Sequence, residues 1–201
     1  MGELAKDGGG LRAATRDAVR RQLSDVALDL FLEHGYDAIT IEQIADEAGI
    51  SARSVHRYFP AKEDLVIDSP EAYGRIVASA LSVRPRDEGV MTSLYSAYAA
   101  LMGTRAQDRR DKVGMYLLSR SASLRARNIE KHERWAELLT PIVSSRLNGK
   151  DADVRARALV QSSLSAFTLA LTTWGNPEEE RSVQDLLKVT FSDLLLIDRS
   201  R

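Results

Sequence analysis

The stretch that decides the fold reads TIEQIADEAGISARSVHRYF and spans residues 40–59. Thr40 and Gln43 have the spacing of a capping box, in which each side chain bonds the other residue's backbone amide at the start of a helix. Gly49 is suited to end that helix, because glycine readily adopts a left-handed backbone, and Ser51 is a suitable N-cap for a second helix. The stretch therefore predicts two short helices joined by a tight turn, which is the helix-turn-helix arrangement.

The second of these helices has an unusual polar face. Val55 and Phe59 fall on the apolar side, which leaves Arg53, His56 and Arg57 exposed together with Ser54 and without any acidic residue. Such side chains can donate hydrogen bonds to base edges and phosphates in a DNA groove. The composition is compatible with a recognition helix and with an ordinary solvated face.

The rest of the chain has the pattern of an all-α protein. Apolar residues recur at spacings of three and four, prolines are few, and no alternating run predicts a strand. Residues 1–11 are expected to form a disordered tail. Helices are predicted at residues 12–34, 41–48, 52–58, 62–82, 88–105, 109–122, 124–147, 151–174 and 178–197.

Composition excludes several classes of protein. The 201 residues are 44% hydrophobic, and 28 basic against 29 acidic side chains give a net charge of −1. The absence of cysteine excludes disulfides and thiolate sites, and three scattered histidines predict no metal site; no cofactor is expected. No apolar run reaches the roughly 18–20 residues of a membrane span, and the N-terminus lacks the apolar core of a secretory signal. We expect a soluble cytoplasmic protein.

Residues 40–51, followed by Val55–Phe59 and Lys62–Leu65 and preceded by Ala27–Tyr36, resemble the DNA-binding domain of TetR-family transcriptional regulators. The resemblance covers about residues 15–65. It implies an all-α homodimer with an N-terminal three-helix helix-turn-helix domain and a C-terminal helical domain for ligand binding and dimerisation. The expected domains are residues 12–60 and residues 61–201. Most members of this family are repressors that leave the operator when a small molecule binds.

The resemblance also implies particular DNA contacts. Thr40 and the amide of Ile41 would face phosphate at a helix N-terminus. Arg53 and Ser54 would read base edges, with guanine the preferred partner of arginine. The remaining expected contacts are His56 and Tyr58, with phosphate or a thymine methyl group, and Lys62, with phosphate. Tyr58 could instead belong to the core, and His56 could simply be exposed.

Two positions depart from the family pattern. His56 stands where an aromatic residue, usually tyrosine, is common, which predicts altered base or phosphate contacts. Ala61 stands where a capping serine, asparagine or aspartate is common, which predicts a weaker start of the next helix, by about 1 kcal/mol.

Charge is unevenly distributed along the chain. Residues 1–65 carry 8 basic and 12 acidic side chains, whereas residues 66–201 carry 20 and 17. Within the acidic half, the basic residues cluster at Arg12–Arg21 and Arg53–Lys62. The arginines at the start of the first helix oppose its dipole, so they have another role or form a solvated face. We expect modest non-specific DNA affinity and contact with only a few phosphates per subunit.

The C-terminal half contains candidates for an apolar ligand pocket. Bulky side chains with a few polar groups suit a small apolar or amphipathic effector, although a packed core is the alternative. The pocket candidates are Tyr95, Tyr98, Met102, Met115, Tyr116, Trp135 and Phe167. Arg120, Asn128 and His132 could supply polar contacts, and each could equally lie on the surface.

Residues 151–174 are rich in alanine and serine, and residues 178–197 are apolar. Together they could form the dimer interface that the resemblance implies, or an intramolecular core. A two-fold dimer places two recognition helices about one DNA turn apart, which predicts a pseudo-palindromic operator. Around Ser69 and Pro70 the predicted helix is interrupted, either as a hinge or as a plain end and restart.

These features favour a ligand-responsive DNA-binding repressor that is not an enzyme. One alternative is an all-helical enzyme that uses the C-terminal cavity. Against it, the sequence has no glycine-rich phosphate loop and no cysteine. A second alternative is a DNA-binding regulator without a small-molecule effector. A closed, packed C-terminal domain would favour that alternative, and a cavity of several hundred Å³ would favour the main hypothesis.

Overall fold

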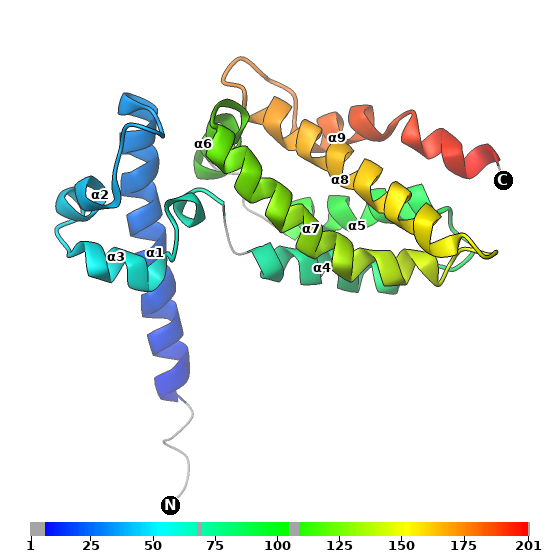
Figure 1. The fold of residues 1–201 in the computed structure, drawn as a ribbon, viewed down its shortest axis with the longest axis horizontal. Helices are drawn as coiled ribbons and strands as arrows, with labels where there is room; N and C mark the ends of the chain where they lie inside the picture. Colours follow the sequence, from blue (N-terminus) through cyan, green and yellow to red (C-terminus); the bar gives the residue numbers. More distant parts are fainter. Residues whose placement is uncertain (1–6, 68–69, 105–108, 201) are drawn as a thin grey trace, which may run out of the picture. The chain divides into compact units, whose positions relative to one another are not determined.

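The computed structural model describes residues 7–67, 70–104 and 109–200, and it contains helices and connections without strands in these ranges (Figure 1). The all-α prediction is confirmed. The chain divides into two compact units between Asp68 and Ser69, eight residues after the expected boundary. In the described part of the chain, no helix is long and apolar enough to cross a membrane.

The first unit is the helix-turn-helix domain. It contains α1 (Asp7–His34), α2 (Ile41–Glu47), α3 (Ala52–Tyr58) and a short 3-10 helix, η1 (Lys62–Leu65). Its core brings together one face of α1, the inner sides of α2 and α3, and η1. The most deeply buried side chains are Ala27, Phe31, Ile44, Ala45, Val55, Phe59 and Leu65.

The first helix is longer than predicted. It begins at Asp7, so residues 7–11, which were expected to belong to a disordered tail, are helical. Extending an existing helix adds one hydrogen bond per ordered residue, which favours propagation once the helix has formed. The tail residues 1–6 lie outside the described residues.

The predicted helix 62–82 is two elements. Leu65 and Ile67 are buried in the first unit. Lys62 Nζ donates to the carbonyl oxygens of Tyr36 at 2.8 Å and Ile39 at 2.9 Å, so η1 belongs with α1 and α2. The second element, α4 (Pro70–Ser82), begins at a proline, whose missing N–H costs nothing in the first turn of a helix. Ser69, part of the proposed hinge, lies outside the described residues.

The second unit is a helical bundle. After α4 it contains α5 (Val90–Thr104), α6 (Arg109–Arg120), α7 (Ala122–Ser144), α8 (Ala152–Gly175), α9 (Val183–Phe191) and the 3-10 helix η2 (Leu194–Ser200). Helix α8 packs against α5, α6, α7 and α9. The predicted helix 178–197 is two elements, α9 and η2, and α9 begins at Val183 because Ser182 Oγ accepts from Asp185 N at 3.1 Å and caps its start.

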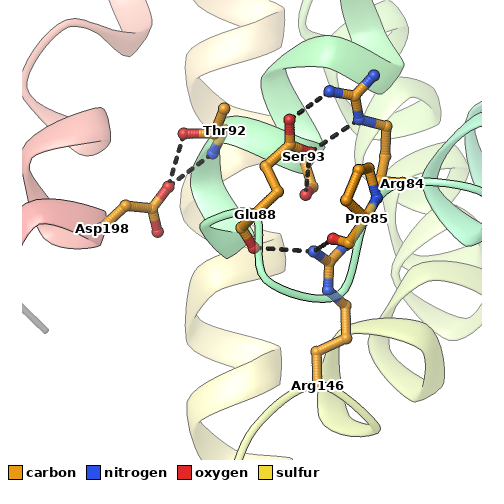
Figure 2. Close-up of polar contacts among 7 residues, drawn as sticks. All are labelled: Arg84, Pro85, Glu88, Thr92, Ser93, Arg146 and Asp198. Atoms are coloured by element: carbon orange, nitrogen blue, oxygen red, sulfur yellow. Dashed lines mark hydrogen bonds and ion pairs between the residues drawn. The ribbon is translucent and has the colours of Figure 1, made fainter.

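The C-terminal η2 caps the start of α5 (Figure 2). Asp198 accepts hydrogen bonds from the amides of Met91 at 3.2 Å and Thr92 at 2.8 Å, and from Thr92 Oγ1 at 2.9 Å. Beside it, a Cβ atom on Gly89 would lie 2.2 Å from Asp198 Cγ, so any larger residue there would force the Asp198 side chain to shift. Arg146 Nη2 holds the connection between α4 and α5 by donating to the carbonyl oxygens of Pro85 at 2.6 Å and Glu88 at 2.9 Å.

Candidate nucleic-acid interface

The start of α2 has the predicted capping box. Gln43 N donates to Thr40 Oγ1 at 3.3 Å, and Thr40 N donates to Gln43 Oε1 at 2.8 Å. The Thr40 oxygen accepts in this pair, while its hydroxyl hydrogen is donated to the Glu42 carboxylate. Ile41 has a buried side chain, which leaves its backbone N–H as the group that can face an anion. A hydrogen bond from its own backbone amide, followed by one from Thr40, lowers the pKa of Glu42.

The turn between α2 and α3 is closed by backbone hydrogen bonds. Gly49 has a φ of 68°, a left-handed value that glycine tolerates. Gly49 N donates to Asp46 O at 3.1 Å, and Ile50 N donates to Ala45 O at 2.9 Å. This pair of bonds is the Schellman motif, and it sets the direction in which the chain enters α3.

Helix α3 presents the polar face that the sequence predicts. Ser51 caps it by accepting from Ser54 N at 3.2 Å, and the two serine hydroxyls lie 2.9 Å apart. Val55 is fully buried against the core, which fixes the rotation of the helix. Arg53, His56 and Arg57 are exposed, and no residue of α3 is acidic, so the exposed face offers donors of positive or neutral charge.

The end of α3 is held by α1. Arg20 Nη1 donates to the carbonyl oxygen of Tyr58, and the Arg20 guanidinium lies 4.3 Å from the centre of the Phe59 ring. Tyr58 itself is half-buried. Arg20 is therefore a structural arginine, a role that spacing along the sequence could not show because its contacts lie 38 residues away.

The contacts of Lys62 and Ala61 differ from those that the sequence predicts. Two of the three N–H donors of Lys62 are engaged by backbone carbonyls, and its ammonium lies 4.1 Å from the centre of the Tyr36 ring. Only one donor remains for a phosphate. Ala61 provides no side-chain cap, but Asp64 Oδ2 accepts from Ala61 N at 3.1 Å. Half of a capping box is therefore retained.

The seven pocket candidates all lie in the second unit. Tyr98, Met102, Trp135 and Phe167 are buried in its core, while Tyr95, Met115 and Tyr116 are half-buried. Tyr98 stacks on Phe167 with ring centres 4.6 Å apart, and its hydroxyl lies 3.1 Å from Ser163 Oγ. Burial raises the pKa of Tyr98. All of these side chains except Tyr116 belong to the core of the second unit or pack against it.

The polar candidates are divided between surface and interior. Arg120 is exposed over the Tyr116 ring, whereas Asn128 is buried. His132 lies between α7 and α8, with Nε2 3.2 Å from Thr168 Oγ1. Burial lowers the pKa of His132 to about 3, so its ring is neutral near pH 7.

An open groove of about 1050 Å³ lies between α7 and α8, and none of the seven pocket candidates lines it. Most of its lining residues are of polar or charged type, so a pattern of bulky apolar side chains in the sequence does not point to it. The lining residues are Glu133, Ala136, Glu137, Thr140, Pro141, Ser144, Ser145, Asp153, Arg157 and Gln161. Across the ranges that the structure describes, no cluster of three His, Cys, Asp or Glu residues could hold a metal ion.

Comparison with known proteins agrees with this geometry. The sequence model for "Bacterial regulatory proteins, tetR family" matches residues 23–68, and that for "MftR C-terminal domain" matches residues 88–196. The transcriptional regulator TcmR of Streptomyces glaucescens is 30% identical over 162 residues, which cover 77% of this chain and 72% of TcmR. The transcriptional repressor KstR2 of Rhodococcus jostii is 32% identical over 143 residues, covering 67% and 70% of the two chains.

A solved structure with a similar fold is FadR of Thermus thermophilus, a TetR-family repressor in complex with lauroyl-CoA. It has a TM-score of 0.51 and 21% identity, over 88% of this chain and 93% of FadR. Two matched domains in the family's order, together with a capped helix-turn-helix, lead to one conclusion. The chain belongs to the TetR family of DNA-binding transcriptional regulators.

Proposed function

We propose that this protein is a ligand-responsive repressor that acts in the cytoplasm and binds a pseudo-palindromic operator as a homodimer. The observation that carries the proposal is the exposed, acid-free face of α3, presented by a capped two-helix unit. A helix of this kind fits the major groove with its N-terminal residues nearest the base edges.

The proposed contacts follow the position of each side chain. Arg53 and Ser54, in the first turn of α3, read base edges, and Arg53 pairs with guanine. Thr40 and the amide of Ile41 bind phosphate at the start of α2. His56 and Tyr58 contact phosphate or a thymine methyl group, and Lys62 uses its remaining donor for phosphate.

The experiment that tests this function is selection of binding sites from random DNA with the full chain, followed by titration of Arg53→Ala on the selected duplex. We expect the substitution to cost about 1–3 kcal/mol of binding free energy and to relax one operator position. Arg86→Ala, an exposed arginine between α4 and α5, is the control and should bind normally. Recovery of no enriched sequence would refute the function, and normal, equally selective binding by Arg53→Ala would remove Arg53 from base readout.

The homodimer is supported by the outer surfaces of α8 and α9. Small residues on α8 point both ways: Ala156, Ser163, Ala166 and Ala170 are buried, whereas Ala158, Ser162 and Ser165 are exposed. The buried set belongs to the intramolecular core. Beside the exposed set, Leu169 and Val189 are 58% and 56% exposed, which suits a partner helix pair.

An effector is supported by the aromatic cluster of the second unit and by the lauroyl-CoA complex of the similarly folded FadR. Because these side chains pack tightly, an apolar or amphipathic effector has to displace some of them. An effector that prefers the displaced arrangement weakens operator binding, and DNA weakens effector binding by the same factor. A metabolite screen for release of the selected duplex tests this, and a ligand that saturates the protein without changing its operator affinity would contradict it.

The second candidate is a regulator of the same family without a small-molecule effector. The burial of Tyr98, Met102, Trp135 and Phe167, with the Phe167 ring stacked on Tyr98 and Trp135, favours it, since a packed second unit needs no ligand for stability. The two candidates differ in the metabolite screen. No described feature favours the enzyme alternative.

A further inference from the structure

The N-terminal part of α1 extends beyond the rest of the first unit. The side chains of residues 14–18 are all exposed, and burial begins around Val19 and Arg20. We call residues 14–18 the α1 arm. A helix whose side chains are exposed on every side gains nothing from packing, so the arm needs another explanation for its composition.

Helical periodicity determines the side of α1 on which Arg16 lies. Arg20, Ser24, Ala27 and Phe31 follow one another on the face of α1 that packs on the domain. Arg16 lies four residues before Arg20, on nearly the same face and about 6 Å further along the axis. Because Arg20 contacts Tyr58 and Phe59, Arg16 is placed about one turn of α1 away from the C-terminal end of α3.

The start of α1 adds positive charge to a first unit that is otherwise acidic. Residues 23–65 carry only three basic side chains, Arg53, Arg57 and Lys62, against nine acidic ones. Residues 12–21 carry four arginines and one aspartate, Asp17. Affinity for DNA comes largely from neutralising phosphates, and the domain proper has little positive charge for it, particularly since Lys62 is engaged.

We propose that the α1 arm is an additional DNA-binding element, in which Arg16 binds a backbone phosphate that flanks the groove occupied by α3. The proposal rests on the proposed function, since it requires α3 to enter the major groove. Past the C-terminal end of an inserted recognition helix lies the neighbouring phosphate strand, and a guanidinium can bind a phosphate through two N–H groups. Such a contact adds affinity and fixes the position of the domain on the duplex, but it does not discriminate between base sequences.

The test uses the full chain, the selected duplex and a random duplex of equal length, titrated over a series of KCl concentrations. We expect Arg16→Ala to raise the Kd about 3–10-fold on both duplexes and to reduce the salt slope by about two for a dimer, one phosphate per subunit. Arg16→Lys should restore most of the slope. Trimming the duplex ends until the flanking phosphates are gone should abolish the difference between Arg16→Ala and the unmodified protein.

Arg21→Ala is the matched control. It removes an exposed arginine of the same helix that points about 140° away from Arg16, and it should change the Kd less than twofold. Equal losses in the two variants, or a loss on the selected duplex alone, would overturn the phosphate contact. An unmodified protein that enriches no DNA would overturn the proposed function itself. Enrichment that is lost in Arg53→Ala and unaffected in Arg16→Ala would overturn only the role of the arm.

Discussion

His132 is a partly buried titratable side chain, with Thr168 as its hydrogen-bond partner and with burial, followed by the charge of Lys131, lowering its pKa to about 3. In an unfolded chain a histidine has a pKa near 6.5, so between about pH 6.5 and pH 3 the unfolded state binds more protons. The stability that His132 contributes as a neutral ring is therefore complete above pH 6.5 and is lost as the pH falls.

We expect the unfolding free energy to fall more steeply in the unmodified protein than in His132→Gln, by up to about 1.4 kcal/mol per pH unit within that window. Glutamine retains a hydrogen-bonding group toward Thr168 without a titrating proton. Urea unfolding of both proteins at several pH values between 4 and 8 measures the difference. Parallel curves would show that His132 is protonated while folded.

Single residues also show how much of the interface could be predicted. The exposed face around Arg53 and the capping roles of Thr40 and Ser51 follow from local spacing, and the structure reproduces the capping. The engagement of Arg20 and Lys62 could not be predicted, because their partners lie 38 and 26 residues away and are brought together only by folding. The sequence shows where the basic residues lie along the chain. It does not show which of them remain available for DNA after folding.

At the scale of elements, alanine substitutions at three glycines distinguish a cost in backbone conformation from a cost in packing. Gly49 needs a left-handed φ but has space for a Cβ, whereas a Cβ on Gly175 would lie 2.6 Å from Tyr116 N in α6. Gly49→Ala should cost about 1–2 kcal/mol through the backbone, and Gly175→Ala about 1–3 kcal/mol because α6 and α8 must separate. Gly103→Ala, in helical backbone with open space, should stabilise the protein by about 0.5–1 kcal/mol.

Urea unfolding followed by circular dichroism checks all three substitutions. The loss in Gly49→Ala should appear in the transition of the first unit, and that in Gly175→Ala in the transition of the second. If Gly103→Ala destabilised the protein as much as the other two substitutions, the cost would not be specific to the backbone at Gly49 or the packing at Gly175. It would then come from adding a methyl group at any position.

The capping of α5 by η2 is a second property of elements. Asp198 satisfies two backbone amides at the start of α5, where such donors otherwise lack intrahelical partners. Asp198→Ala should cost about 1–2 kcal/mol, the range of a lost N-cap, and should speed hydrogen exchange at Met91 and Thr92. Asp193→Ala, which removes an exposed carboxylate just before η2, should leave both unchanged. Unaltered exchange in Asp198→Ala would show that η2 is held by its leucines alone.

Element boundaries followed the sequence where a local signal existed. The capped helices α2 and α3 were predicted to within one residue, whereas the helices predicted at 62–82 and 178–197 are each divided. Apolar periodicity continues through Leu65 and Leu194 because both side chains pack on a core, and a short 3-10 turn satisfies that pattern as well as an α-helix does. Periodicity reports which side is buried and cannot distinguish one long helix from two short elements.

At the scale of the whole molecule, two units with separate cores need a device that places two recognition helices on one operator. The proposed two-fold dimer would supply it, and the exposed apolar residues Leu169 on α8 and Val189 on α9 offer a surface for this purpose. Leu169→Glu would introduce a charge into such an interface, and each subunit would repeat it. We expect sedimentation velocity to show monomers, with an unchanged helix content, because Leu169 lies outside the core.

Binding should report the same change. Without a partner, one helix-turn-helix unit loses the contribution of the second half-site, so Leu169→Glu should bind the selected duplex with an affinity close to that for random DNA. Ile129→Glu, at an equally exposed apolar position on α7, is the control and should remain dimeric with normal operator affinity. A dimeric Leu169→Glu protein would remove α8 from the interface, and a monomeric Ile129→Glu protein would place the interface on α7. If Leu169→Glu is monomeric yet binds the operator tightly, one recognition unit suffices, and the pseudo-palindromic operator is wrong.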